Sequence, residues 1–277
     1  MLVDSHCHLQ DRKYRADVED VIHRAFNSGV TALVTIGYDM PSSRRAIEIA
    51  DAHDNIYATV GVHPHDAKTL TARDLNELSR MADSSRVVAI GEIGLDFYRD
   101  LSPRDEQYRA FREQLALAKT LRLPVVIHSR DADEQVFEVL TEYEREARAD
   151  WPKDRPIGVM HCYAGDLPLA LRYIDIGFVI SIAGPVTYAR SEATRAVASG
   201  IPLRWMAVET DAPYLPPQRI RGERNEPANV CDVAEFVANL RGTTFAEVAD
   251  KTAQTASSLF GLGDIGQPLA EAAKEAR

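Results

Sequence analysis

The sequence has few cysteines, no long apolar run and no basic segment at its start, and each absence narrows the class of protein. Three cysteines, Cys7, Cys162 and Cys231, are too few and odd in number for a disulfide framework, so we expect reduced thiols in a cytoplasmic protein. No apolar run approaches the roughly 20 residues that a membrane helix needs, so no membrane contact is expected. The chain enters an apolar strand pattern directly, so we expect no signal peptide.

Basic residues are also scarce. The chain has 32 lysines and arginines against 42 acidic residues, which gives a net charge of −10, and its pI is about 5.3. Proteins that coat duplex nucleic acid usually carry a basic face, and this sequence has no lysine-rich run. Any contact with nucleic acid must therefore be local, and bound divalent cations would supply the positive charge that the composition lacks.

What the sequence does contain is a regular alternation of strand and helix patterns. Hydrophobic residues make up 45% of the chain, and the apolar runs are rich in Val, Ile, Ala and Leu, as is typical of buried parallel strands. The expected strands are 1–7, 31–36, 56–62, 86–91, 124–128, 156–161, 177–182 and 204–209. The expected helices are 14–28, 42–53, 70–83, 103–122, 131–147, 166–176, 189–199 and 229–240. Eight strand–helix units predict a (β/α)₈ TIM barrel of the α/β class.

No linker divides this order, so we expect one domain over residues 1–277. The stretch 211–229 follows the last strand, is rich in Pro, Arg and Asn, and is interpreted as a loop over the mouth of the barrel. Segment 145–156 is polar and is expected to be a surface excursion. The Ala- and Glu-rich tail, about 263–277, is expected to be a loosely attached, frayed helix.

Histidines and carboxylates stand where the apolar runs end. In a TIM barrel the active site lies at the C-terminal ends of the strands, which is where these residues fall. His6 and His8 are two residues apart and therefore share one strand face, on which Asp4 also lies as a candidate partner behind them. The other residues of this kind are His63, Glu92, His128, His161, Glu209 and Asp211. Imidazoles and carboxylates that converge at one barrel mouth are typical of a divalent-metal site.

Each residue has a plainer interpretation when taken alone. His6 and His8 could be a surface pair, Glu92 a solvated turn residue, and His128 or His161 a core histidine with a satisfied hydrogen bond. The recurrence of such residues on successive strands favours the metal site. Asp211 is assigned as a metal ligand, and Glu209, two residues earlier, as an auxiliary ligand or a support for one. Asp96 is interpreted as a loop acid that orients a neighbour.

Seven motifs together resemble the TatD family of metal-dependent deoxyribonucleases, within the amidohydrolase superfamily. They are DSHCHLQ, GVHPH, AIGEIGLDFY, VIHSRDA, HCY, ETDAPYLPP and RNEPANV, and they extend from residue 4 to residue 230. One departure is HCY at 161–163, where the family more often has HCF. The resemblance implies two divalent ions, with Glu92 as the bridge where many amidohydrolases use a carboxylated lysine. The implied ligands are His6, His8, Glu92 and Asp211 for one ion, and Glu92, His128 and His161 for the other.

The ligand set predicts hydrolysis by a metal-activated water, with Mg²⁺, Mn²⁺ or Zn²⁺ as the candidate ions. Asp211 is the candidate proton acceptor and Glu92 the catalytic bridge. The resemblance places His63 near the substrate, where it would bind a phosphoryl oxygen or protonate the leaving group. Arg130 is a further substrate-binding candidate, with a salt bridge to a neighbouring aspartate as the alternative. In the 211–229 loop, the candidates for contact with the nucleic-acid backbone are Arg219, Arg221 and Arg224, with a solvated loop face as the alternative.

Three functions fit these residues. The first is exonuclease-like cleavage of DNA by a monomer, on single strands or at ends, which the family resemblance favours. The second is hydrolysis of small esters, lactones or amides with the same metals, because fold and ligands are shared between such enzymes. The third is a non-catalytic binding protein, which has no need of the complete ligand set.

Overall fold

The computed structural model describes residues 1–152 and 154–262 and contains an eight-stranded parallel sheet with the strands in sequence order. The strands are β1 (Val3–Cys7), β2 (Ala32–Ile36), β3 (Ile56–Val60), β4 (Val87–Asp96), β5 (Val125–Arg130), β6 (Gly158–Met160), β7 (Phe178–Ile182) and β8 (Met206–Val208). At the seam, the amide of Asp211 donates to the carbonyl of His6 (2.9 Å), and the amide of His8 donates to the carbonyl of Ala212 (2.7 Å). The sheet is therefore a nearly closed barrel, as the sequence predicts.

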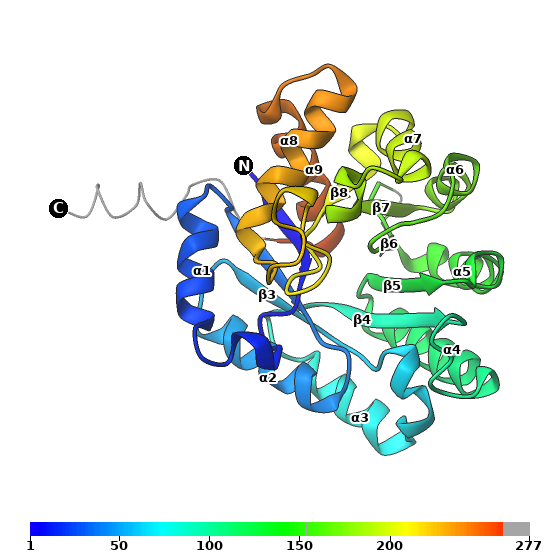
Figure 1. Ribbon diagram of the computed structural model, residues 1–277. Coiled ribbons are helices and arrows are strands. Elements are labelled where there is room, and N and C mark those ends of the chain that lie inside the picture. The colour runs from blue at the N-terminus through cyan, green and yellow to red at the C-terminus, as the bar shows by residue number, and fades with distance from the viewer. Residues whose placement is uncertain (153, 263–277) are drawn as a thin grey trace.

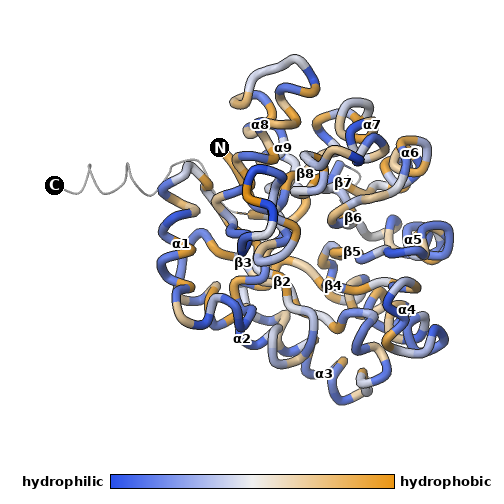
Figure 2. The backbone as a smooth tube through the Cα atoms, in the orientation of Figure 1, coloured by the Kyte–Doolittle hydropathy of each residue, from blue (hydrophilic) through white to orange (hydrophobic). Residues whose placement is uncertain are grey.

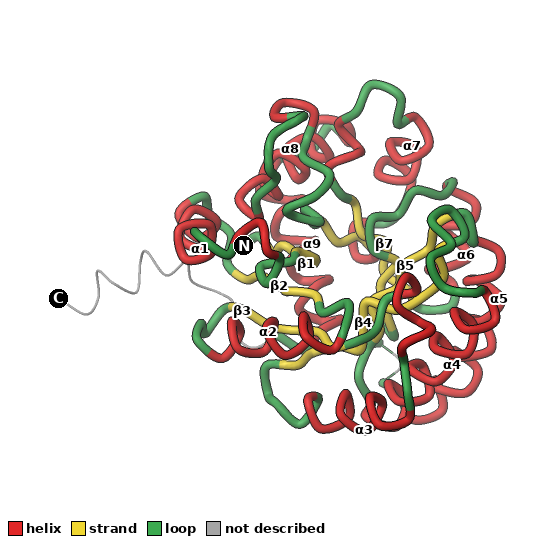
Figure 3. Tube along the Cα trace, turned by 60° about the horizontal axis from the view of Figure 1, so that its bottom comes forward, coloured by secondary structure: helices red, strands yellow, loops and turns green. Residues whose placement is uncertain are grey.

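Helices surround the barrel on its outer side (Figures 1 and 3). They are α1 (Val18–Asn27), α2 (Met40–Asp51), α3 (Ala72–Met81), α4 (Arg104–Leu121), α5 (Asp133–Ala147), α6 (Leu167–Asp175), α7 (Glu192–Gly200), α8 (Val230–Arg241) and α9 (Phe245–Phe260). The strands are largely apolar, whereas the helices alternate apolar and polar residues (Figure 2). This difference is expected when strands are covered on both faces and helices on one.

Short 3₁₀ turns lie in the connections. They are η1 (Arg12–Tyr14), η2 (Pro64–Thr69), η3 (Arg148–Asp150), η4 (Gly184–Thr187), η5 (Leu203–Trp205), η6 (Gln218–Ile220) and η7 (Pro227–Asn229). The 211–229 segment lies beside the turn after β1, since Arg224 donates to the carbonyl of Lys13 (2.8 Å) and the hydroxyl of Tyr214 donates to Asp11 (2.6 Å) (Figure 1). In the described part of the chain, no helix is both long enough and apolar enough to cross a membrane.

Helix α9 was not expected from the sequence. Its buried side chains are mostly Ala and Thr, which give a weak apolar pattern. Ala253, Ala256, Leu259 and Phe260 pack in one cluster with strand residues such as Val3, the first residue of β1. Helix α9 therefore closes the N-terminal end of the barrel.

The sequence also led to expectations for segment 145–156 and for the C-terminal tail. Within segment 145–156, which was expected to be a surface excursion, Trp151 is 6% exposed and its indole donates to the carbonyl of Arg155 (3.1 Å), so this residue packs against the fold. The tail predicted as a frayed helix, 263–277, lies outside the described residues.

Candidate metal centre

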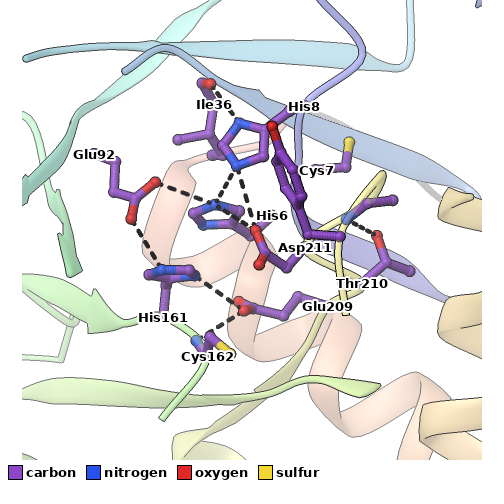
Figure 4. Close-up of polar contacts among 12 residues, drawn as sticks. His6, Cys7, His8, Ile36, Glu92, His161, Cys162, Glu209, Thr210 and Asp211 are labelled. Carbon is purple, nitrogen blue, oxygen red and sulfur yellow. Dashed lines mark hydrogen bonds and ion pairs between the residues drawn. The ribbon is translucent and has the colours of Figure 1, made fainter. Parts of the chain in front are cut away.

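Two imidazoles of β1 and its end face a carboxylate from the segment after β8. The Nε2 atoms of His6 and His8 lie 3.3 Å apart, and Asp211 Oδ1 lies 3.6 Å from the first and 3.3 Å from the second. Glu92 Oε2 lies 3.6 Å from His6 Nε2 (Figure 4). These four side chains, which the sequence predicts as ligands of one ion, thus point at a common position.

The second oxygen of Glu92 faces another group of imidazoles. Glu92 Oε1 lies 2.8 Å from His128 Nδ1, 3.0 Å from His161 Nε2 and 3.4 Å from His63 Nε2. Because its two oxygens face different histidine groups, Glu92 stands between them as a bridging carboxylate would. It lies within β4, which continues beyond the predicted end at residue 91 to Asp96.

The donor spacing fits bound divalent cations. Ligand atoms held about 2.1 Å from one ion lie about 3.0–3.4 Å from each other. The separations among His6, His8 and Asp211, 3.3–3.6 Å, fall at or just above the upper end of this range. Three triads of the described residues bring their donor atoms within 4.8 Å: His6–His161–Asp211, His6–His8–Glu92 and His63–Glu92–His128.

The ring nitrogens that face away from the cluster are held as in metal sites. His8 Nδ1 donates to the carbonyl of Ile36 (3.0 Å), and His161 Nδ1 lies 3.2 Å from Glu209 Oε1. His128 Nε2 lies 3.1 Å from Asp96 Oδ2. A histidine ligand usually donates its second ring N–H to a carbonyl or carboxylate, which leaves the other nitrogen free for the ion. The buried Nδ1 of His6 is the exception, with no hydrogen-bond partner among the described residues.

The electrostatics of the cluster divide its histidines: despite burial, nearby carboxylates raise the pKa of His8, His128 and His161, whereas the pKa values of His6 and His63 are lowered. Burial and then repulsion from His161 hold the pKa of His6 well below its ordinary value, and burial and His128 lower the pKa of His63 to about 4. Burial opposes the ionisation of Glu92, yet His161 and His63 hold its pKa well below the usual range. Neutral imidazole and ionised carboxylate are the metal-binding forms of these groups.

Two glycines allow β4 to bring Glu92 to this position. Gly91 has φ +154°, and a Cβ there would lie 2.7 Å from the Val126 Cβ. Gly94 has φ +144°, and a Cβ there would lie 2.0 Å from the carbonyl oxygen of His128. The close approach of β4 to β5 therefore requires glycine on both sides of the carboxylate.

Asp4 and Glu209 act behind the cluster. The register between β1 and β2 shifts between Asp4 and Cys7, so strict alternation fails there, and Asp4 accepts hydrogen bonds from the Thr210 amide (2.9 Å) and hydroxyl (2.6 Å). It thereby fixes the residue before Asp211. Glu209 accepts from the Cys162 amide (2.7 Å) and faces His161, so the geometry favours support of this histidine over an auxiliary ligand.

The predicted arginines have partners of their own. Arg130 stacks on the Tyr98 ring (3.9 Å), Arg219 pairs with Asp232 (2.8 Å), and Arg221 stacks on Tyr188 (4.6 Å).

Arg224 is the most strongly engaged of the loop arginines. Its Nη2 lies 2.6 Å from Asp17 and 3.0 Å from Glu226. It ties the loop after β8 to the start of α1.

His65 and Asp96 belong to the site in ways that the sequence did not fully predict. Asp96 is fully buried at the end of β4, not in a loop, and its Oδ2 lies 2.8 Å from His65 Nε2 and 3.1 Å from His128 Nε2. The expectation that it orients a neighbour fits this position. His65 received no role from the sequence, although its two-residue spacing from His63 repeats that of His6 and His8.

A parallel barrel with buried His, Asp and Glu donors at its C-terminal mouth defines a metal-dependent hydrolase of the TIM-barrel type. The family described as "TatD related DNase" matches residues 3–261. The chain therefore belongs to the TatD family.

Individual relatives agree with this assignment. The chain is 42% identical over 260 residues to "Uncharacterized metal-dependent hydrolase YabD" of Bacillus subtilis, covering 94% of this chain and 99% of the relative. It is 38% identical over 267 residues to "3'-5' ssDNA/RNA exonuclease TatD" of Pantoea ananatis, covering 94% and 100%. The crystal structure of YJJV, a TatD homologue from Escherichia coli K12, superposes with a TM-score of 0.86 at 29% identity and covers 95% of this chain and 98% of that one.

Proposed function

We propose that the protein is a divalent-metal-dependent exonuclease that hydrolyses phosphodiester bonds of single-stranded DNA or of DNA ends. The observation that carries this proposal is the position of Glu92, whose two oxygens face two separate groups of imidazoles. Such an arrangement suits two cations flanking one phosphodiester. The name of the Pantoea relative, an exonuclease of single-stranded DNA and RNA, supports the same substrate class.

The residues divide the work as follows. His6, His8, Glu92 and Asp211 would hold one divalent ion, and Glu92, His128 and His161 a second. Bound there, the ions would supply positive charge for the phosphate and lower the pKa of the water that attacks once it is deprotonated. Asp211, whose side chain is 13% exposed, accepts the proton from the attacking water.

His63 binds a phosphoryl oxygen. Its Nδ1 accepts the amide hydrogen of His65 (3.1 Å), so its Nε2 carries the ring proton and donates toward the site. A neutral imidazole with its proton on Nε2 is better suited to donate a hydrogen bond to a phosphoryl oxygen than to protonate the leaving group.

The experiment combines metal analysis with digestion of labelled oligonucleotides. Purified protein is analysed for bound metal, stripped with chelator and supplied with Mg²⁺, Mn²⁺ or Zn²⁺. It is then given single-stranded DNA labelled at the 3′ or 5′ end, with RNA and small esters in parallel. Metal-dependent shortening of DNA from one end is expected. Digestion by Asp211→Asn equal to that of wild type at saturating metal, or hydrolysis of the small esters alone, would overturn the proposal.

We further propose that the enzyme acts in the cytoplasm as a monomer. Its three cysteines are free in the structure, which suits a reducing compartment. Light scattering of the purified protein and fractionation of the source cells test the two statements.

A further inference from the structure

A groove next to the metal centre has no role in the chemistry described so far. Its volume is about 680 Å³, within the range of small-molecule sites. Its walls come from the turn after β1 (η1), from the start of α2 and from the loop after β8, three segments that lie together in Figure 1. We name it the η1–α2 groove.

Two tyrosines connect the groove to the metal centre. Tyr38 follows β2, Tyr214 follows β8, and both rings line the groove. Each also packs edge-on against the His8 ring, with centroids 5.5 and 5.9 Å away. A ligand with one group at the metal centre therefore continues into this groove past two aromatic side chains.

The charge of the groove is positive, in contrast to the net charge of −10 for the whole chain. Three arginines line it: Arg12, Arg15 and Arg45. Arg45 pairs with Glu48 (2.8 Å), whereas Arg12 and Arg15 are exposed and have no ion-pair partner within residues 1–152 and 154–262. Two of the three loop arginines predicted from the sequence to bind nucleic acid differ in this respect, since Arg219 and Arg224 are paired with carboxylates, whereas Arg221 stacks on Tyr188.

The two acidic residues of the groove are held by local contacts. Asp11 accepts from the Lys13 amide (2.7 Å) and from the Tyr214 hydroxyl (2.6 Å). Asp39 caps α2 by accepting from the Ser42 amide (2.7 Å). Two carboxylates therefore face three guanidinium groups, and two of the latter are free to bind an anion.

We propose that the η1–α2 groove binds the part of a single-stranded nucleic acid that adjoins the scissile phosphodiester. Arg12 and Arg15 contact its phosphates, and the rings of Tyr38 and Tyr214 face its bases. This assignment rests on the proposed nuclease function and moves substrate binding from the 211–229 arginines to the turn after β1. Exposed cationic side chains beside aromatic rings are the combination that holds single strands without sequence preference.

The test compares two double variants of equal charge change. Arg12→Ala/Arg15→Ala removes the free groove arginines. Arg145→Ala/Arg204→Ala is the matched control, because both residues are exposed and lie at the other end of the barrel, in the last turn of α5 and in the turn before β8. Steady-state kinetics are measured on a labelled single-stranded oligonucleotide at several salt concentrations, and on a bis-nitrophenyl phosphate diester that is too small to reach the groove arginines.

The groove variant should raise KM for the oligonucleotide about tenfold and leave kcat unchanged. Loss of two phosphate contacts should reduce the slope of log affinity against log salt by about 1.4. The control variant, and hydrolysis of the small diester by both variants, should match wild type. Tyr214→Leu should also raise KM for the oligonucleotide, without a change in the salt slope.

The outcomes separate the two proposals. If wild type digests the oligonucleotide and the groove variant matches it in KM and salt slope, the groove assignment is wrong and the nuclease function stands. An equal loss in the control variant would also overturn the groove assignment, since it would show an effect of net charge alone. If wild type cleaves the small diester but no nucleic acid, both proposals fail. Thermal melts of both variants confirm that each is folded.

Discussion

The two ends of the barrel are lined by opposite kinds of side chain. At the N-terminal end, Leu259 and Phe260 of α9 pack against apolar strand residues such as Val3. At the C-terminal end, buried imidazoles surround Glu92, which is 4% exposed. Burial of apolar side chains stabilises the fold, whereas burial of charged groups is costly unless they are paired or bind a metal. Stability is therefore concentrated at one end and chemistry at the other, so substitutions at the two ends should have separable effects.

The largest expected effect is the loss of activity in Glu92→Gln. Loss of a residue that only supports a metal ligand typically lowers activity or metal affinity about 10–100-fold. Loss of the bridging carboxylate itself should therefore reduce kcat on the order of 10³-fold. Bound metal should fall as well. The melting temperature of the metal-free protein should stay close to that of wild type, because glutamine has the same shape and removes a buried charge.

Glu138→Gln on the exposed side of α5 is the matched control and should change neither activity nor metal content. Metal analysis, kinetics and thermal melts on the two variants make the measurement. A Glu92→Gln protein with full activity would contradict the role of the polar end.

A substitution at the N-terminal end of the barrel should lower stability and leave activity unchanged. Phe260→Ala removes a side chain that is 3% exposed in the apolar cluster under the barrel, so the free energy of unfolding should fall by about 3–5 kcal/mol. At temperatures where the variant is folded, kcat should match wild type. Chemical denaturation gives the first quantity and kinetics the second.

Phe245→Ala, at the start of the same helix, is the control, since this ring is 42% exposed and should contribute far less. A large fall in kcat for folded Phe260→Ala would show that the two ends are coupled.

The contrast between the ends also explains what the sequence predicts well. Strands and the polar residues at their ends are local patterns, and the topology of a parallel barrel brings these ends together without further information. The convergence of His6, Glu92 and Asp211 follows from this rule, and their ligand roles remain a prediction. Helix α9 was missed because its buried face is built from Ala and Thr, and its pairing with β1 is a contact between the two ends of the sequence.

Other features of the site depend on contacts between distant segments. The hydrogen bond between Thr210 and Asp4 joins residues 206 positions apart in the chain, so it is not visible in the alternation of β1 alone. The position of Asp96 within β4 depends on its pairing with Arg130 of β5. One partner of Arg224, Asp17, likewise lies 207 residues away in the chain.

A smaller effect is expected at the edge of the polar end. Asp96→Asn removes the carboxylate that faces both His65 and His128, so the ring of His128 loses the partner that orients it toward Glu92. Activity should fall about 10–100-fold, with weaker metal binding. Kinetics at rising metal concentration measure both, and excess metal should restore part of the loss. Asp100→Asn in the following loop is the control, since the Asp100 side chain is 44% exposed.

The smallest effect is expected from substitution of Arg224. This substitution tests whether the residue anchors the 211–229 loop or binds the substrate. Arg224 holds the pKa of Asp17 below its ordinary value, and despite burial, pairing with Arg24 and Arg224 lowers the pKa of Glu226. A depressed carboxyl pKa stabilises the fold above the unfolded-state pKa, near pH 4, and this contribution is lost as the pH falls through the folded-state value.

Arg224→Gln should therefore be less stable than wild type at pH 7, by about 0.2–1 kcal/mol for the pair with Glu226, and the difference should shrink well below pH 4. Denaturation at several pH values measures it. KM for the oligonucleotide should stay unchanged, because the guanidinium is already held by Asp17 and Glu226 and is not free to bind phosphate. A raised KM with unchanged stability would instead show that Arg224 binds the substrate. The substrate would then contact the 211–229 loop in addition to, or in place of, the groove beside His8.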